Sequence, residues 1–189
     1  EARNTIVKDT TVQQPGFSEN WAAFTARPGT RRLLLAIGFG AAAFAMQDAL
    51  LEPYGGEILG LSVGSTTSLT GAWAFGALVA FAFCARKLPG GTDPLRLAGF
   101  GAVVGVAAFL TILFAAPLES AAMLFVGATA VGFGTRLFSV GTMIAAMALA
   151  RNGAAGIALG AWGAVQASCA GLGVALGGMI RDGVSRQGD

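Results

Sequence analysis

The chain has 189 residues, of which 54% are hydrophobic and 12% charged, and its mean hydropathy is +0.68. Soluble domains carry about 25% charged residues, so this composition argues against a soluble globular protein. A net charge of +2 without a basic stripe argues against a nucleic-acid partner, and the absence of histidine removes the commonest zinc ligand and proton shuttle.

The first 30 residues are polar and are predicted to form a cytoplasmic linker or an amphipathic segment. Phe17, Trp21 and Phe24 recur at helical spacing, which favours a short interfacial helix, and a partly ordered linker remains the alternative. Because the chain begins at Glu1 without a signal peptide, we expect it to start inside a longer protein.

Five apolar stretches follow, at residues 33–51, 63–85, 97–116, 121–150 and 154–180. Each is near or above the roughly 20 residues that a helix needs to cross the hydrocarbon core. We therefore predict an all-α integral membrane protein with about five transmembrane helices in residues 31–183 and a polar tail in residues 184–189. The fourth stretch would be about 45 Å long as one helix, so it must tilt, bend or project from the membrane.

Positive charges occupy alternate connections: Arg27, Arg31 and Arg32 before the first span, Arg86, Lys87 and Arg96 after the second, and Arg151 after the fourth. The connections at residues 52–62 and 117–120 contain neither Lys nor Arg. The positive-inside rule then predicts a cytoplasmic start, although Arg181 and Arg186 in an outer tail mildly contradict it. An odd number of spans suggests that a sixth helix is missing.

Small residues and cysteines within the spans are interpreted as packing residues. Glycines recur four residues apart at Gly101/Gly105, Gly156/Gly160 and Gly173/Gly177, a spacing that permits close helix crossings. Cys84 and Cys169 lie in apolar segments and match no metal-binding or disulfide pattern.

A first group of polar residues is predicted near the outer end of the first span: Gln47, Asp48, Glu52, Tyr54 and Glu57. Asp48 and Glu52 share a helix face, Pro53 is expected to end the helix, and a tyrosine suits the membrane interface. One interpretation is a carboxylate cluster at the outer mouth that binds a cation, a proton or a pigment metal. The other is an ordinary helix end whose acids reach water.

A second group, Arg136 and Gln166, lies far from the predicted ends of the fourth and fifth spans. Arg136 is about 21 Å and Gln166 about 18 Å from the cytoplasmic side, so the two could share a layer near the midplane. Arg136 could meet an anionic group, or it could be a snorkelling or structurally paired side chain. No nucleophile–base pair is available without histidine, so we expect no enzyme.

Three runs resemble one protein family. Residues 47–64, which read QDALLEPYGGEILGLSVG, are similar to the signature of the PucC family, the branch of the major facilitator superfamily tied to bacteriochlorophyll and light-harvesting assembly. Residues 134–147 (GTRLFSVGTMIAAM) and 156–167 (GIALGAWGAVQA) resemble the tenth and eleventh helices of that family.

The resemblance implies helices 7–11, within the C-terminal half of a 12-helix fold, in the bacterial inner (intracytoplasmic) membrane. It implies an assembly factor for light-harvesting antenna complexes, handling bacteriochlorophyll or nascent antenna polypeptides. The alternatives are a secondary transporter of a pigment precursor or other amphiphile and a structural subunit of a photosynthetic core complex. Implied partners are membrane lipids, the missing N-terminal half, and light-harvesting polypeptides or the reaction-centre antenna complex.

The implied cofactor is bacteriochlorophyll, bound transiently or stably, and no protein-ligated transition metal is expected. Because the chain has no histidine, magnesium would take an oxygen ligand from Gln47, Asp48, Glu52 or Glu57, from a backbone carbonyl or from water. The charged loop motif of the superfamily is degenerate in residues 86–96, which argues against conventional proton-coupled transport.

Overall fold

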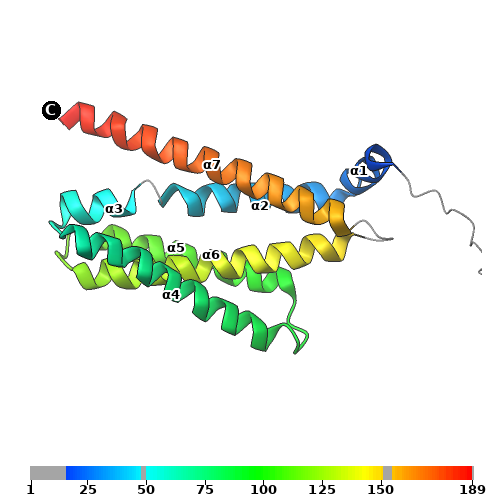
Figure 1. The fold of residues 1–189 in the computed structure, drawn as a ribbon, viewed down its shortest axis with the longest axis horizontal. Helices are drawn as coiled ribbons and strands as arrows, with labels where there is room; N and C mark the ends of the chain where they lie inside the picture. The colour runs from blue at the N-terminus through cyan, green and yellow to red at the C-terminus, as the bar shows by residue number, and fades with distance from the viewer. Residues whose placement is uncertain (1–15, 48–49, 151–154, 189) are drawn as a thin grey trace, which may run out of the picture.

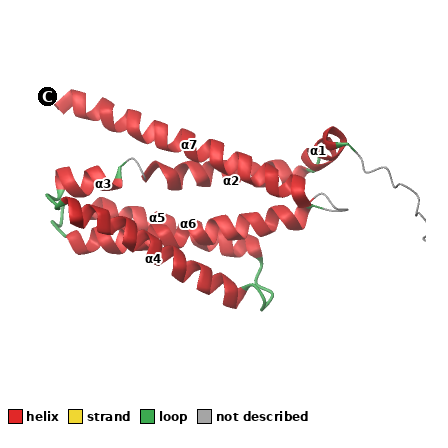
Figure 2. Cartoon of the chain, viewed as in Figure 1, coloured by secondary structure: helices red, strands yellow, loops and turns green. Residues whose placement is uncertain are grey.

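The computed structural model describes residues 16–47, 50–150 and 155–188, and these contain helices and no strand (Figures 1 and 2). Five segments of this described part are long and apolar enough to cross a membrane: Pro28–Ile58, Val63–Lys87, Pro94–Ala115, Ala121–Leu149 and Ala155–Val184. The predicted fold class, an all-α membrane protein with about five spans, is confirmed.

The helices follow one another in the order α1 (Phe17–Thr25), α2 (Pro28–Met46), α3 (Leu51–Pro53), the π-helical turn η2 (Tyr54–Ile58), α4 (Val63–Lys87), α5 (Pro94–Ala115), α6 (Ala121–Leu149) and α7 (Ala155–Gly188). Three of them begin at a side chain that accepts a hydrogen bond from a backbone N–H of the first turn, namely Ser62, Asp93 and Ser120. Such caps satisfy donors that a helix start otherwise leaves unpaired.

The short helix α1 forms in the segment for which the sequence allowed either an interfacial helix or a partly ordered linker. Its Phe24 is only 2% exposed and packs against Ala158 and Ala161 of α7. The other end of the chain also differs from expectation, because α7 continues past Ile180 to Gly188 and residues 184–188 extend this helix.

The first span is described in two pieces, because residues 48 and 49 lie outside the described residues. Helix α2 ends at Met46, with Gln47 as its C-cap, and helical structure resumes at Leu51 and continues through Pro53 to Ile58. The expectation that Pro53 ends the helix is therefore wrong. Proline is tolerated in a first helical turn, where its missing N–H has no intrahelical partner, and Pro53 lies in the first turn of α3.

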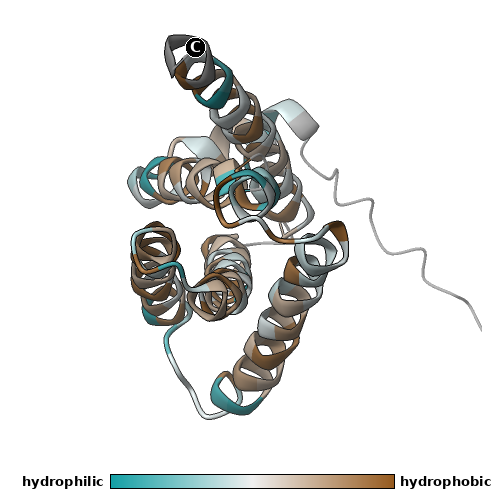
Figure 3. Ribbon diagram, turned by 90° about the vertical axis from the view of Figure 1, so that its left-hand side faces the viewer, coloured by the Kyte–Doolittle hydropathy of each residue, from teal (hydrophilic) through white to brown (hydrophobic). Residues whose placement is uncertain are grey.

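Helix α6 is the centre of one packed group, lying along α4 and α5, whereas α7 packs mainly against α2 (Figure 1). Seen end-on in Figure 3, apolar residues colour the outward as well as the inward faces of the helices. Exposed side chains such as Phe39, Val103 and Met179 belong to this outer surface. An apolar exterior around helices with satisfied backbone hydrogen bonds suits a lipid environment.

The glycine pairs that the sequence singled out behave differently from one another. A Cβ atom on Gly101 would lie 2.7 Å from the carbonyl oxygen of Gly134, so α5 and α6 cross there at close range. Gly173 meets Ala42 of α2 in a similar way. Gly156 and Gly160, by contrast, have no neighbour within 4 Å of such a Cβ, so this pair makes no crossing in the described chain.

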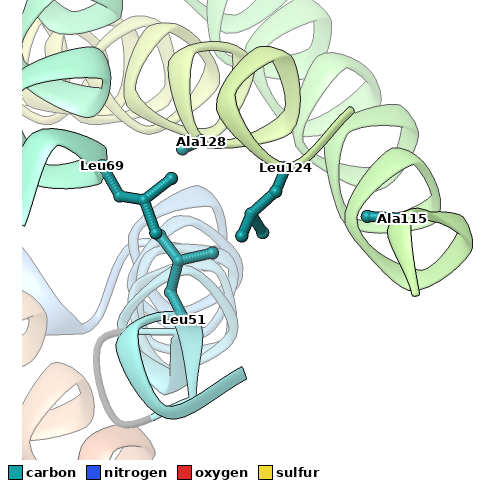
Figure 4. Close-up of a cluster of buried hydrophobic side chains, with 5 residues drawn as sticks. All are labelled: Leu51, Leu69, Ala115, Leu124 and Ala128. Carbon is teal, nitrogen blue, oxygen red and sulfur yellow. The ribbon is translucent and has the colours of Figure 1, made fainter. Parts of the chain in front are cut away.

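The start of α3 is fixed by an apolar cluster that joins four helices (Figure 4): Leu51 of α3, Leu69 of α4, Ala115 of α5, and Leu124 and Ala128 of α6. Figure 4 shows the leucine side chains pointing toward one another. Burial of such side chains stabilises a helix too short to be stable alone. The cluster therefore holds α3 against the bundle.

Candidate functional site

Two cavities lie next to the end of α2. The larger has a volume of about 410 Å³ and is almost entirely apolar. Its lining comes from α2, α3, η2 and α5: Ala43, Met46, Gln47, Leu50, Leu51, Tyr54, Phe109, Ile112 and Leu113. Among these described lining residues, Gln47 and Tyr54 alone have polar side chains, so the cavity suits a hydrocarbon-rich group better than an ion.

The smaller cavity has a volume of about 220 Å³ and is more polar. It lies among α2, α4, α6 and α7, and its lining includes Gln47, Trp73, Thr135, Arg136, Phe138, Ser139 and Gln166. Gln47 lines both cavities and is 8% exposed. The amide that the sequence placed at an outer helix end is therefore inside the bundle.

Arg136 and Gln166 line the same cavity, in agreement with the depth argument from the sequence. The Nε2 atom of Gln166 donates a hydrogen bond to Ser139 Oγ at 3.4 Å, which joins α7 to α6. A second polar contact between these helices is the hydrogen bond from Trp162 Nε1 to Thr142 Oγ1 at 3.1 Å. These two hydrogen bonds, one helical turn apart on α7, link polar side chains of α6 and α7.

The Arg136 guanidinium lies over aromatic rings of α4. Its central carbon is 5.0 Å from the Trp73 ring centroid and 6.0 Å from that of Phe81. Within the described chain Arg136 forms no ion pair, and its Nε atom is buried without a hydrogen-bond partner. A charged side chain at the centre of a membrane helix costs about 2.5–3.5 kcal/mol, and cation–π contacts of about 0.5–2 kcal/mol offset only part of this.

The acids predicted for an outer cluster do not line either cavity where the structure describes them. Glu52 and Glu57 are exposed, and Glu52 Oε1 accepts a hydrogen bond from Thr70 Oγ1 at 3.4 Å. Asp48 lies outside the described residues. Among the described residues, no three His, Cys, Asp or Glu side chains come close enough to hold a metal ion.

Tyr54 contributes its ring to the apolar cavity and its hydroxyl to the end of α5. The hydroxyl donates to the carbonyl oxygen of Ile112 at 3.0 Å and accepts from the backbone N–H of Ala116 at 3.0 Å. Tyr54 therefore fixes η2 against the end of α5, a role that the sequence did not indicate.

Replacing Tyr54 with phenylalanine should lower the free energy of unfolding by about 1–2 kcal/mol, because a part-buried backbone donor and a part-buried backbone acceptor lose their partner. The ring and the cavity lining would stay in place. Thermal unfolding of the purified protein in detergent measures the change. A variant as stable as the parent protein would contradict this role of the hydroxyl.

Sequence reasoning missed Trp73, whose Nε1 atom is buried without a hydrogen-bond partner. An unpaired buried donor of this kind costs about 1–3 kcal/mol. The sequence did contain a signal for Trp73, because a tryptophan in the middle of a predicted span carries an N–H that requires an acceptor. Phe138 was missed for a simpler reason, since a phenylalanine in an apolar helix is usually a packing residue.

Comparison with known proteins identifies relatives along almost the whole chain. A family model described as "PUCC protein" matches residues 1–188. The chain is 52% identical over 171 residues to "Protein PucC" of Rhodovulum sulfidophilum, covering 90% of this chain and 38% of that protein. It is 42% identical over 182 residues to "Protein PucC" of Cereibacter sphaeroides, covering 96% of this chain and 40% of that protein.

A more distant relative is the "Bacteriochlorophyll synthase 44.5 kDa chain" of Rhodobacter capsulatus, 31% identical over 171 residues, with 86% of this chain and 38% of that protein covered. The chain spans about two fifths of the length of these curated relatives. No solved structure matches it. The family model and the identities over most of the chain agree with the resemblance seen in three separate runs of sequence, and the chain belongs to the PucC family.

Proposed function

We propose that the chain is part of an assembly factor for bacterial light-harvesting complexes, which handles bacteriochlorophyll or nascent antenna polypeptides in the inner (intracytoplasmic) membrane. Family membership and the name of the relative called a bacteriochlorophyll synthase chain support this role. The proposed role is non-catalytic, since the sequence has no histidine to serve as a base. Its partners would be light-harvesting polypeptides, membrane lipids and the remainder of the longer protein.

The apolar cavity is the observation that carries the proposal. Its volume of about 410 Å³ falls within the usual range for ligand pockets, about 300–1,000 Å³. The lining is hydrocarbon apart from Gln47 and Tyr54, which suits part of a chlorin ring or its hydrocarbon tail. Magnesium favours oxygen ligands, and the Gln47 amide would supply one. The Tyr54 hydroxyl is already hydrogen-bonded to backbone groups at the end of α5.

The proposed membrane arrangement follows the positive-inside rule. The start of α2, the end of α4 and the start of α5 lie at one end of the bundle (Figure 1). These segments carry Arg31 and Arg32, Arg86 and Lys87, and Arg96 respectively. We place this end in the cytoplasm and equate the five spans with helices 7–11 of a major-facilitator-type fold.

Filling the apolar cavity should reduce pigment binding. With Ala43 of α2 replaced by phenylalanine, we expect the full-length protein, purified from a pigment-making host without antenna partners, to retain severalfold less bacteriochlorophyll per protein. Ala74 of α4 is exposed and lies outside both cavities, so Ala74→Phe is the matched control and should keep the parent pigment content. The near-infrared absorption band measures the ratio.

Two results would count against pigment handling at this cavity. One is a colourless, folded parent protein, which would favour polypeptide handling or a structural role. The other is equal pigment content in the Ala43→Phe and Ala74→Phe variants, which would place the pigment elsewhere in the longer protein.

A secondary transporter is the second candidate, and the polar cavity among α2, α4, α6 and α7 favours it. Helix α2 ends beside this cavity, and transporters bind their substrates between helices near the middle of the membrane. This role requires substrate accumulation driven by an ion gradient. Reconstituted vesicles with and without such a gradient would distinguish it from a non-transporting assembly factor.

A further inference from the structure

The polar cavity contains a permanent positive charge, and none of its described lining residues is acidic. The Arg136 guanidinium stays protonated under all physiological conditions, so it cannot relieve its burial by losing a proton. Its central carbon lies 5.0 Å from the centroid of the Trp73 ring and 6.0 Å from that of Phe81. Its Nε–H donor remains without an acceptor in the described chain.

A second unsatisfied donor lines the same cavity. The indole Nε1 atom of Trp73 is buried and has no hydrogen-bond partner among the described residues. Ser139 can supply a third donor, because its oxygen accepts a hydrogen bond from Gln166 Nε2 and its own proton is still available. Three donors from α4 and α6, one of them charged, thus border one cavity of about 220 Å³.

The positions of these donors are fixed by the crossing of α4 and α6. A Cβ atom on Gly132 would lie 2.0 Å from the carbonyl oxygen of Trp73, so the two backbones are in direct contact. Arg136 follows Gly132 by one helical turn and therefore lies beside Trp73. A site held by packed helices is preorganised, which lowers the entropic cost of binding a ligand.

We propose that Arg136 and Trp73 form a binding site for a single carboxylate group in the interior of the bundle. One carboxylate would neutralise one guanidinium and accept hydrogen bonds from the Arg136 Nε–H and the Trp73 Nε1–H. A dianionic phosphate would leave a net negative charge buried, which is unfavourable in a medium of low dielectric constant. The small volume admits a carboxylate and the first atoms attached to it.

The carboxylate can come from two sources. It can be the acid group of an amphipathic ligand, or it can be an acidic side chain of the same longer protein. The chemistry at Arg136 is the same in both cases, and it does not depend on pigment handling. A test with a simple fatty acid therefore succeeds or fails separately from the pigment experiment.

The test uses the full-length protein in nanodiscs of zwitterionic lipid and compares 12-bromododecanoate with its methyl ester. Bromine quenches tryptophan fluorescence at short range, so quenching against concentration gives the affinity of each probe. We expect the acid to bind about tenfold or more tightly than the ester, with Arg136→Gln removing the preference. Arg136→Lys should retain part of this preference for the acid, because lysine keeps the positive charge but lacks the planar guanidinium with its several N–H donors.

Arg96→Gln is the matched control, since Arg96 is an exposed arginine at the start of α5 and lines neither cavity. If the parent protein shows no preference but Arg136→Gln lowers the unfolding temperature and Arg96→Gln does not, the carboxylate is supplied by the protein itself. If there is no preference and both variants unfold alike, the proposal is overturned. A preference that survives Arg136→Gln overturns it as well.

Discussion

Replacing Gly76 with alanine should strongly destabilise the protein, although the substitution adds one methyl group. A Cβ atom at this position of α4 would lie 1.9 Å from the carbonyl oxygen of Thr129 and 2.8 Å from its carbonyl carbon, both in α6. Backbone atoms within a packed helix cannot rotate away as a side chain can. We therefore expect a loss at or above the upper end of the about 1–3 kcal/mol typical of overpacked cores.

Gly71→Ala is the matched control, because it lies on the same helix and has no neighbour within 4 Å of an added Cβ. Thermal unfolding in detergent should show a lower midpoint and a lower folded yield for Gly76→Ala, and values near those of the parent protein for Gly71→Ala. Equal midpoints in the two variants would show that α4 and α6 do not cross at this point.

The same crossing connects packing to the polar cavity. Gly132 contributes the reciprocal contact, with its added Cβ 2.0 Å from the Trp73 carbonyl oxygen. Any separation of α4 from α6 would move the Trp73 ring away from the Arg136 guanidinium, since the two residues belong to different helices. The glycines are therefore as important for the proposed carboxylate site as the residues that line it.

The class of protein and the five spans could be predicted from the sequence, because an uncharged apolar run of about 20 residues is typical of a helix that crosses a bilayer. The shared depth of Arg136 and Gln166 followed from the fixed rise of a helix. Family membership could be recognised from the run that begins at Gln47. Each of these inferences uses local information along the chain.

The end of α2 at Met46 and the close crossings could not be predicted in the same way. The sequence between Ala41 and Ile58 offers Pro53 as the obvious end of the helix, whereas α2 ends at Met46 and Leu51, at the start of α3, is buried in the apolar cluster. In the sequence, nothing distinguishes Gly76 and Gly132 from Gly156 and Gly160. Only the packed structure shows that the first two lie at a helix crossing and that the other two face open space. The unpaired Trp73 donor likewise becomes visible only when its surroundings are known.

Helix α7 depends on α2 for most of its packing, so a bulky residue at their closest approach should detach it. A Cβ atom on Gly173 would lie 2.3 Å from the carbonyl oxygen of Ala42, and the contact between Gly38 and Cys169 lies one turn away. We expect Gly173→Leu to separate the two helices and open the side of the polar cavity that Gln166 and Ala170 form.

The two cysteines of the chain report this change directly, because they belong to different interfaces. Cys169 is a free thiol at the contact of α2 with α7, whereas Cys84 is a free thiol, 4% exposed, buried among α4, α5 and α6. In detergent, N-ethylmaleimide should alkylate Cys169 severalfold faster in Gly173→Leu than in the parent protein, with Cys84 unchanged, as peptide mass spectrometry would show. Gly171→Leu, with no neighbour within 4 Å of an added Cβ, should leave both rates unaltered. Faster alkylation of both cysteines would indicate general unfolding, and unchanged alkylation of Cys169 would mean that α7 does not rely on this contact.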